Sequence, residues 1–169
     1  MDQKLIDEIN IQIKLEFFSA HLYLAMASYA KAHDLDGFEN WLLTQRDEEN
    51  FHAMKFYRYM HERGEAVKIF GYEDPKNDYG SLKEVFEYAL AHEKTVTARI
   101  NYLMDIAVET KDYAASQFLQ WYIDEQVEEE DSFRTMLGKI NMVGEVGEGI
   151  YHLDKEAAAR TFTPPPANA

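Results

Sequence analysis

Residues 38–59 read FENWLLTQRDEENFHAMKFYRY, and their apolar side chains recur at the spacing of one face of an α-helix. The same face carries Glu49 and His52 near its middle, between Trp41 and Phe56. A carboxylate on the core face of a helix is costly unless it is paired or binds a metal ion. The stretch therefore predicts a helix that carries metal-binding side chains into a protein core.

Three further stretches repeat this pattern. Their apolar residues recur at steps of three and four, and the alternation typical of a strand is sustained nowhere. The polar side chains that interrupt the four apolar faces are Glu16, then Glu49 with His52, then Glu93, then Gln126 with Glu129. We therefore expect four helices that close around a shared ionic centre, which is an all-α four-helix bundle with a metal site inside.

The bounds of the helices follow from the apolar stripes and from turn-forming residues. We expect four long helices and a short fifth over about residues 2–32, 38–63, 81–111, 113–141 and 150–160. Gly64 is a suitable C-terminal stop, and Ser81 with Glu84 three residues later has the capping-box pattern that begins a helix. Residues 64–80 show no helical stripe and are numerous enough to form a crossover along the length of the bundle.

Composition restricts the class of protein. The chain has 169 residues, which suits one domain over residues 1–160 and a Pro-rich tail over residues 161–169 that is extended or disordered. The chain has no cysteine, which excludes disulfides, thiolate metal sites and a thiol nucleophile. The net charge of −14 argues against nucleic acid as a partner and is compatible with attraction of cations.

Targeting signals are also missing from the sequence. No run of about 18 apolar residues is present, so we expect no membrane span. The N-terminus lacks the basic start and apolar core of a signal peptide. Together with the absence of cysteine, these features lead us to expect a cytoplasmic protein.

The residues on the four faces form a set of metal ligands. Glu49 and His52 lie one helical turn apart, which is the Glu-x-x-His spacing of carboxylate-bridged dimetal bundles. Glu16 and Glu93 have apolar neighbours and few basic residues on their stripes, which favours a metal ion over an ion pair. Two divalent cations would neutralise these three carboxylates together with Glu129. Hard oxygen ligands with one imidazole suit iron or manganese more than copper(I), while zinc remains an alternative.

The fourth helix departs from a symmetric site. Gln126 and Glu129 stand where a second Glu-x-x-His would supply another imidazole, so the second ion should be held less tightly and exchange more readily. This suits a site through which metal passes. Glu48, Glu125 and Glu128 lie beside these ligands around the helices, where they form either a third acidic site or a solvated face.

These motifs together resemble the bacterial and archaeal non-haem ferritins, over about residues 3–160. The resemblance rests on the lone Glu16, on Glu-Glu-x-x-His at residues 48–52, on Glu93, and on Glu-Gln-Val-Glu-Glu-Glu at residues 125–130. It implies a ferritin-like bundle and a homo-oligomeric hollow shell of 24 subunits. It also implies oxidation of Fe(II) by oxygen or hydrogen peroxide, with ferric oxide-hydroxide deposited inside the shell.

The resemblance also assigns roles to individual residues. The first iron would be held by Glu16, Glu49 and His52. The second would be held by Glu49, Glu93 and Glu129, with Gln126 nearby. A third would be held by Glu48, Glu125, Glu128 and Glu129. Tyr23 matches a tyrosine near the family's site and Trp121 a nearby tryptophan, although core packing explains both residues equally well.

We expect no haem. The haem-binding relatives have a methionine directly after the bridging glutamate of the second helix, where this chain has Asn50, and they carry Glu-x-x-His in the fourth helix. Two alternatives to a ferritin remain: another dimetal bundle oxidoreductase, such as a rubrerythrin-like peroxidase or an oxygenase, and a non-catalytic metal buffer. The lack of a cysteine iron site and of an extra domain counts against the first. The remaining histidines are interpreted as surface or packing residues, namely His21, His33, His61, His92 and His152.

Overall fold

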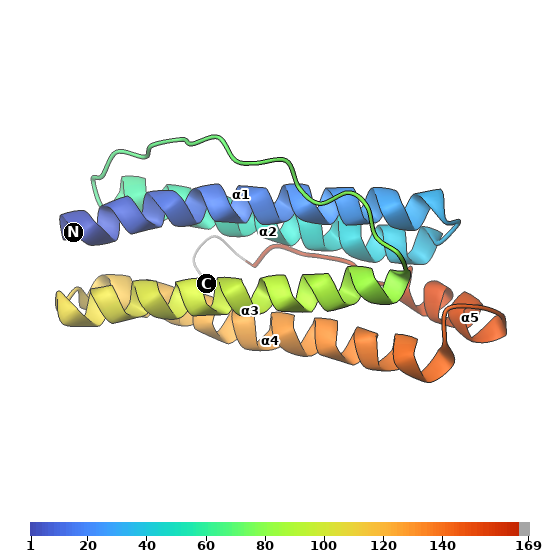
Figure 1. The fold of residues 1–169 in the computed structure, drawn as a ribbon. Helices are drawn as coiled ribbons and strands as arrows, with labels where there is room; N and C mark the ends of the chain where they lie inside the picture. The colour runs from blue at the N-terminus through green and yellow to red at the C-terminus, as the bar shows by residue number, and fades with distance from the viewer. Residues whose placement is uncertain (166–169) are drawn as a thin grey trace.

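A computed structural model describes residues 1–165, which form five helices and no strand (Figure 1). The helices are α1 (Gln3–Ala32), α2 (Asp36–Glu62), α3 (Leu82–Glu109), α4 (Tyr113–Val143) and α5 (Glu148–Ala157). The prediction of an all-α bundle with a short fifth helix is confirmed. None of these helices combines the length and the apolar character needed to cross a membrane. The expectation for the Pro-rich tail lies partly outside the described residues.

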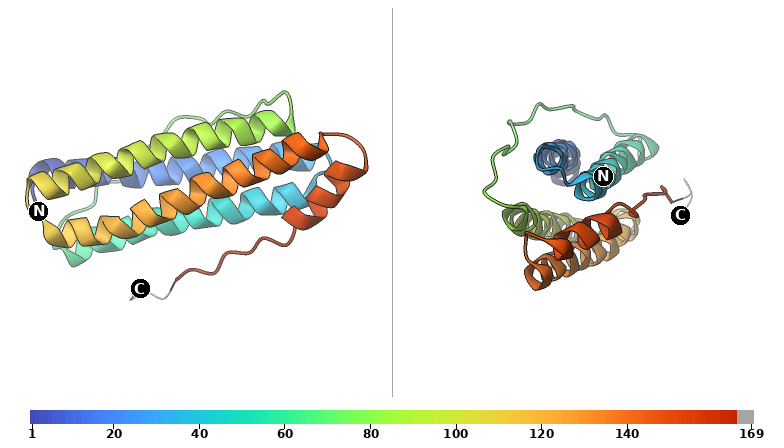
Figure 2. Two further views of the ribbon diagram at one scale, coloured as in Figure 1. Left: turned by 90° about the horizontal axis from the view of Figure 1, so that it is seen from below. Right: turned by 90° about the vertical axis from the view of Figure 1, so that its right-hand side faces the viewer.

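The four long helices form two antiparallel hairpins, α1 with α2 and α3 with α4 (Figure 1). Residues 64–80 run back along the first hairpin over α1, so α3 starts at the end of the bundle where α2 starts (Figures 1 and 2). This is the predicted crossover. α1 lies beside α3, and α2 meets α4 through side chains such as Phe56 and Tyr122, whose stacked rings have centroids 4.1 Å apart.

The crossover is bounded by the expected residues, with one difference. Gly64 follows α2 with a φ of +75°, a left-handed conformation that favours glycine. Ser81 caps α3, because its Oγ accepts a hydrogen bond from Glu84 N at 3.0 Å. The Glu84 carboxylate accepts from Gly80 N at 2.7 Å rather than from the backbone of Ser81, so only half of the predicted capping box forms.

α5 packs against α2 and α4 at one end of the bundle and supplies a missing cap (Figure 2). Leu35 precedes α2 and offers no side-chain acceptor, so Asp154 of α5 accepts a hydrogen bond from Phe38 N at 3.0 Å. A Cβ added to Gly37 would lie 1.7 Å from the backbone oxygen of Asp154. The close approach of α5 to α2 therefore depends on a glycine at this position.

Several predicted helix bounds shift by two or three residues, and the contacts explain two of these shifts. The turn after α1 is completed by Asp34, whose φ is +59°, so α2 begins at Asp36 rather than at Phe38. α5 ends at Ala157 rather than at Arg160. The backbone oxygens of Ala158 and Arg160 accept hydrogen bonds from the Asn40 side chain of α2 instead of continuing the helix.

The core consists of two apolar clusters separated by a polar layer. One cluster, near α5, contains Tyr23, Phe86 and Phe133, and the other contains Phe56 and Tyr122. The layer between them contains buried polar side chains from all four long helices, and these include Glu16, Glu49, His52, Glu93, Gln126 and Glu129. The bundle therefore encloses six of the side chains that the sequence singled out.

Candidate metal centre

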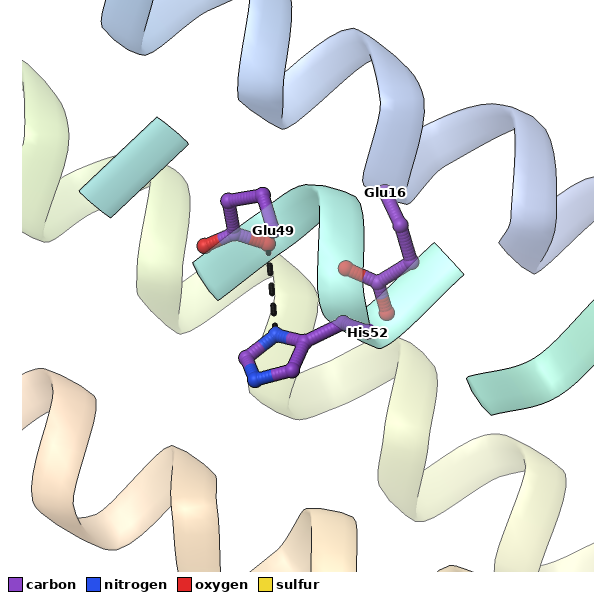
Figure 3. A group of neighbouring side chains, drawn as sticks. All are labelled: Glu16, Glu49 and His52. Carbon is purple, nitrogen blue, oxygen red and sulfur yellow. Dashed lines mark ion pairs between the residues drawn. The ribbon is translucent and has the colours of Figure 1, made fainter. Parts of the chain in front are cut away.

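Three predicted ligands come together between α1 and α2. Glu16 on α1 and Glu49 and His52 on α2 each offer a ligand atom, and these atoms all lie within 4.8 Å of one another (Figure 3). The distance from His52 Nδ1 to Glu49 Oε2 is 3.5 Å. The three residues are only 1%, 2% and 3% exposed, respectively. This arrangement of two carboxylates and an imidazole in an apolar interior suits a divalent cation.

Two glutamine side chains orient the carboxylates of this group. Gln12 Nε2 donates to Glu16 Oε1 at 2.9 Å, and Gln45 Nε2 donates to Glu49 Oε1 at 3.1 Å. Each glutamine lies four residues before its glutamate, so the pair is in contact along one face of the helix. Glu16 Oε2 has no hydrogen-bond partner among residues 1–165. A buried carboxylate oxygen without a partner is costly, and a bound cation would satisfy it.

The other predicted ligands lie in the same buried layer and are held by donors. Tyr23 OH donates to Glu93 Oε1, and Gln126 Nε2 donates to Glu93 Oε2 at 3.1 Å. Gln45 Nε2 donates to Glu129 Oε2 at 2.8 Å. Among residues 1–165, the tight group consists of Glu16, Glu49 and His52 alone, and it does not include Glu93 or Glu129.

Burial and mutual repulsion shape the electrostatics of this layer. Burial raises the pKa of Glu16, Glu49 and Glu129 well above the ordinary value of a glutamate. Repulsion raises these pKa values further, because Glu49 repels Glu16 and Glu93 repels both Glu49 and Glu129. Carboxyl groups in such surroundings hold protons unless a cation replaces them. Either protonation or a bound cation would therefore relieve the repulsion within this layer.

The three further acidic residues are more open to solvent. Glu48 Oε2 accepts a hydrogen bond from Arg160 Nη2 at 2.5 Å. Glu125 Oε2 is 4.0 Å from His52 Nε2, and Glu128 is exposed. Burial raises the pKa of Glu48 although the charge of Arg160 opposes this, and burial likewise raises the pKa of Glu125. No close cluster of ligand atoms forms among these three in the described part of the chain.

The two aromatic residues named by the resemblance adjoin the centre in different ways. Tyr23 is fully buried, and its ring stacks on Phe133 with the centroids 5.5 Å apart while its hydroxyl reaches Glu93. Trp121 packs edge-on against the His52 ring at 5.5 Å. Tyr23 therefore contacts a predicted ligand carboxylate, and Trp121 contacts the imidazole.

Sequence reasoning gave no role to Gln12, Gln45 or Arg160. The first two carried a usable signal, because Gln-x-x-x-Glu occurs on the core face of both α1 and α2. Arg160 carried none, since it lies 112 positions after Glu48 and beyond the last helix. Among the histidines assigned to surface or packing, His92 is half-buried with its Nε2 in a hydrogen bond with Ser19 Oγ at 2.7 Å, and the other four are exposed.

Comparisons with known proteins agree on one family. A family model described as a ferritin-like domain matches residues 6–143. A bacterial non-haem ferritin of Staphylococcus saprophyticus is 41% identical over 162 residues, covering 96% of this chain and 97% of its own. The open-pore ferritin of Archaeoglobus fulgidus superposes with a TM-score of 0.93 at 42% identity, covering 95% of this chain and 99% of its own. An engineered closed form of that ferritin gives a TM-score of 0.94 at 42% identity, covering 96% and 99%.

Proposed function

This chain belongs to the ferritin family, and from that premise we propose that it stores iron after oxidising Fe(II) at the centre enclosed by its four long helices. The observation that carries the proposal is the buried group of Glu16, Glu49 and His52, with ligand atoms within 4.8 Å of one another and an unpartnered carboxylate oxygen on Glu16. Family membership supplies iron as the metal. The hard oxygen and imidazole ligands suit that ion.

We assign two Fe(II) ions to the centre as substrates. The first is held by Glu16, Glu49 and His52. The second is held by Glu49, Glu93 and Glu129, with Gln126 nearby. Glu49 serves both ions in this assignment, and the neutral Gln126 gives the second ion a weaker ligand set. The second ion is therefore the one that exchanges more readily.

The oxidation balances with a pair of ions. Each Fe(II) loses one electron, and the two electrons reduce oxygen to hydrogen peroxide or hydrogen peroxide to water. Glu16, Glu49 and Glu129 give up the protons that their raised pKa values favour when the cations arrive. The apolar clusters on either side keep bulk water from the site. Tyr23 and Gln126 hold the Glu93 carboxylate in place.

The oxidised iron is stored as ferric oxide-hydroxide inside a hollow shell of 24 copies in this proposal. Glu48, Glu125, Glu128 and Glu129 form a third position for iron on its way between the pair and the interior. Burial raises the pKa of Glu48 and Glu125, and repulsion from Glu128 adds to the rise at both. This supports the role, because carboxylates that repel one another favour a cation between them. Two sequence expectations complete the proposal: a cytoplasmic location, and a folded unit over residues 1–160 with residues 161–169 as its tail.

Stopped-flow absorbance after mixing the metal-free protein with Fe(II) and oxygen tests the function. We expect Glu49→Ala and His52→Ala each to slow the fast phase of oxidation at least tenfold, since each loses a ligand of the pair. Glu62→Ala and His61→Ala are matched controls, because both residues are exposed on the same helix. Normal rapid oxidation in either ligand variant would overturn the dimetal assignment.

The same mixing experiment, followed by microscopy and size analysis of the product, separates the alternatives. A ferritin oxidises many ions per chain and builds a mineral that microscopy and size analysis detect. A dimetal oxidoreductase retains its two ions and builds none, and a metal buffer shows no rapid oxidation. We expect the first of these results.

A further inference from the structure

The segment after α5 turns back along α2 toward the metal centre (Figure 2). Asn40 Nδ2 donates to the backbone oxygens of Ala158 and Arg160 at 3.2 and 3.0 Å. Further along, the ring of Phe162 lies edge-on to that of Phe51, with the centroids 5.8 Å apart. These contacts fix Arg160 on the face that α2 turns toward α4.

The Arg160 guanidinium is held by three partners. Its Nη2 donates to Gln45 Oε1 at 2.6 Å and to Glu48 Oε2 at 2.5 Å. Its central carbon lies 3.9 Å from the centroid of the Trp41 ring, in cation–π contact. The Arg160 and Glu48 side chains are only 17% and 16% exposed. A permanent positive charge is therefore fixed beside Glu48.

Arg160 also acts on the dimetal ligands through Gln45. The Gln45 amide has an oxygen that accepts hydrogen bonds and a nitrogen that donates them, and Arg160 donates to the oxygen. The Gln45 nitrogen then faces the centre, where it donates to Glu49 at 3.1 Å and to Glu129 at 2.8 Å. The guanidinium thus keeps the amide oxygen, a potential metal ligand, turned away from the centre.

A surface cavity leads to the outer side of Arg160. Its volume is about 420 Å³, and its lining includes the carboxylates of Glu128, Asp131 and Glu156 as well as Arg160 itself. Lys139 also lines the cavity, where it pairs with Glu156. The three carboxylates outnumber the two cations of the lining, Lys139 and Arg160, so the cavity has a small net negative charge that favours cations over anions. A cation that enters this cavity meets the guanidinium before it reaches Glu48.

We propose that Arg160 is a positioning residue that occupies, as a tethered cation, the place beside Glu48 where a further metal ion binds, and that it must leave Glu48 before that ion enters. The inference rests on the proposed function for the existence of the dimetal centre. A guanidinium does not lose its proton near neutral pH, so only its displacement can free the carboxylate. Arg160 then sets how readily metal passes between the cavity and the centre.

Calorimetric titration of the assembled, metal-free protein with Zn(II) tests the proposal without any redox step. Parent and Arg160→Gln should bind the first, tight ions alike. The later, weaker binding should tighten about tenfold in Arg160→Gln, because a positive charge within about 4 Å of the ion's place is removed. Arg160→Lys should keep the weak binding of the parent, since the charge remains. Combining Arg160→Gln with Glu48→Gln should abolish the gain.

Arg134→Gln is the matched control for net charge. Arg134 is exposed on α4 and pairs with Asp131, whose side chain lines the same cavity, but it does not touch Glu48 or Gln45. We expect its Zn(II) titration to match that of the parent. If later Zn(II) binding tightened as much in this control as in Arg160→Gln, the proposal would be overturned, because the change in net charge alone would then explain the effect.

A second measurement uses protein that retains Arg160 and detects the displacement of its side chain. The chain has two tryptophans, so in a Trp121→Phe background the emission comes from Trp41, on which Arg160 lies. We expect Trp41 emission to change as the later Zn(II) ions bind, and to stay constant over the same additions when Arg160→Gln is also present.

Failure of the proposed metal centre and failure of the proposed role of Arg160 give different results. If tight Zn(II) binding is missing in every variant, the proposed metal centre falls and this inference falls with it. If tight binding is present, but later binding is the same in parent and Arg160→Gln and Trp41 emission stays constant, only the role of Arg160 is overturned. Arg160→Lys behaving like Arg160→Gln would likewise overturn it.

Discussion

At Glu49 the proposed metal binding and the stability of the fold make opposite demands. Its carboxylate lies between two apolar clusters, 2% exposed, and it faces other carboxylates in the same layer. Burial and repulsion raise its pKa above the 4.5 of a free glutamate. Selection for stability alone would favour a neutral residue here, so the carboxylate supports the proposal that this position binds a cation.

The sign of the pH effect follows from that raised pKa. The folded protein binds the Glu49 proton more tightly than the unfolded chain, so folding of the metal-free protein is favoured at low pH. That advantage is lost as pH rises from about 4.5 through the folded value. We expect Glu49→Gln to remove this loss and to stabilise the metal-free protein at neutral pH by on the order of 1 kcal/mol.

Calorimetric melting in a chelator across pH measures this effect, with exposed Glu62→Gln as the control on the same helix. Adding Zn(II) should raise the melting temperature of the parent more than that of Glu49→Gln. A variant that melts below the parent at neutral pH would contradict the account, since the carboxylate would then be stabilising without metal.

Tyr23 offers a second prediction at the residue scale. Tyr23→Phe removes the hydroxyl that donates to Glu93 but keeps the ring stacked on Phe133. Loss of a partner that orients a metal ligand should slow the initial iron oxidation about tenfold. Tyr122→Phe is the control, because its hydroxyl donates to the backbone oxygen of His52 at 2.8 Å and not to a ligand carboxylate. Stopped-flow traces that order the two variants the other way would refute this role.

The limits of sequence reasoning are clear for these residues. Glu49 and His52 could be placed on a core face because helical spacing fixes which side chains share a face. Arg160 could not be placed, because its contact with Glu48 spans 112 positions and depends on how the tail folds over α2. Gln45 lies one helical turn before Glu49, yet its role depends on contacts with Glu129 and Arg160 that helical spacing does not reveal.

At the scale of elements, α5 supplies the cap that the start of α2 lacks. α2 begins without a cap of its own, and Asp154 of α5 supplies one across 116 positions. The dipole of α2 places positive charge at this end, which also favours a carboxylate there. The earlier start of α2 and the earlier end of α5 both follow from this packing, so single-helix signals could not predict them. The four long helices were predictable because their stripes persist over many turns.

Gly37→Ala should undock α5. The new methyl group would lie 1.7 Å from backbone that cannot move without moving the helix, so α5 has to shift. We expect a loss of several kcal/mol, more than the roughly 1 kcal/mol that a lost cap costs in Asp154→Ala. Gly138→Ala on α4 is the matched control, because its methyl group would meet nothing within 4 Å and should be neutral or stabilising.

Thermal melting and limited proteolysis near residues 144–147 report on α5. Cleavage there should speed up in Gly37→Ala and remain as in the parent in Gly138→Ala. Because the tail follows α5, Gly37→Ala should also loosen the contact between Arg160 and Glu48. Equal melting of the two glycine variants would show that the close approach of the helices is unimportant.

For the whole molecule, the absence of haem remains a prediction. Asn50 directly follows Glu49, at the position where haem-binding relatives have methionine, and a thioether is the ligand that haem iron would need there. We expect no Soret band in protein purified from cells supplied with haem. A Soret band in the parent protein would contradict the prediction. Asn50→Met restores the thioether and tests whether its absence is the reason that haem does not bind.

The division of the bundle into two hairpins has a consequence for the order of folding. Glu16 and Glu49 belong to the first hairpin, Glu93 and Glu129 to the second, and residues 64–80 separate the two. Each hairpin can form from contacts that are local in sequence, before the four carboxylates meet. Glu16 and Glu49 already repel each other within the first hairpin. Repulsion between the two hairpins is added in the last step, when they join. A cation present at that moment should lower the barrier, so we expect the availability of metal to affect how fast a newly made chain matures.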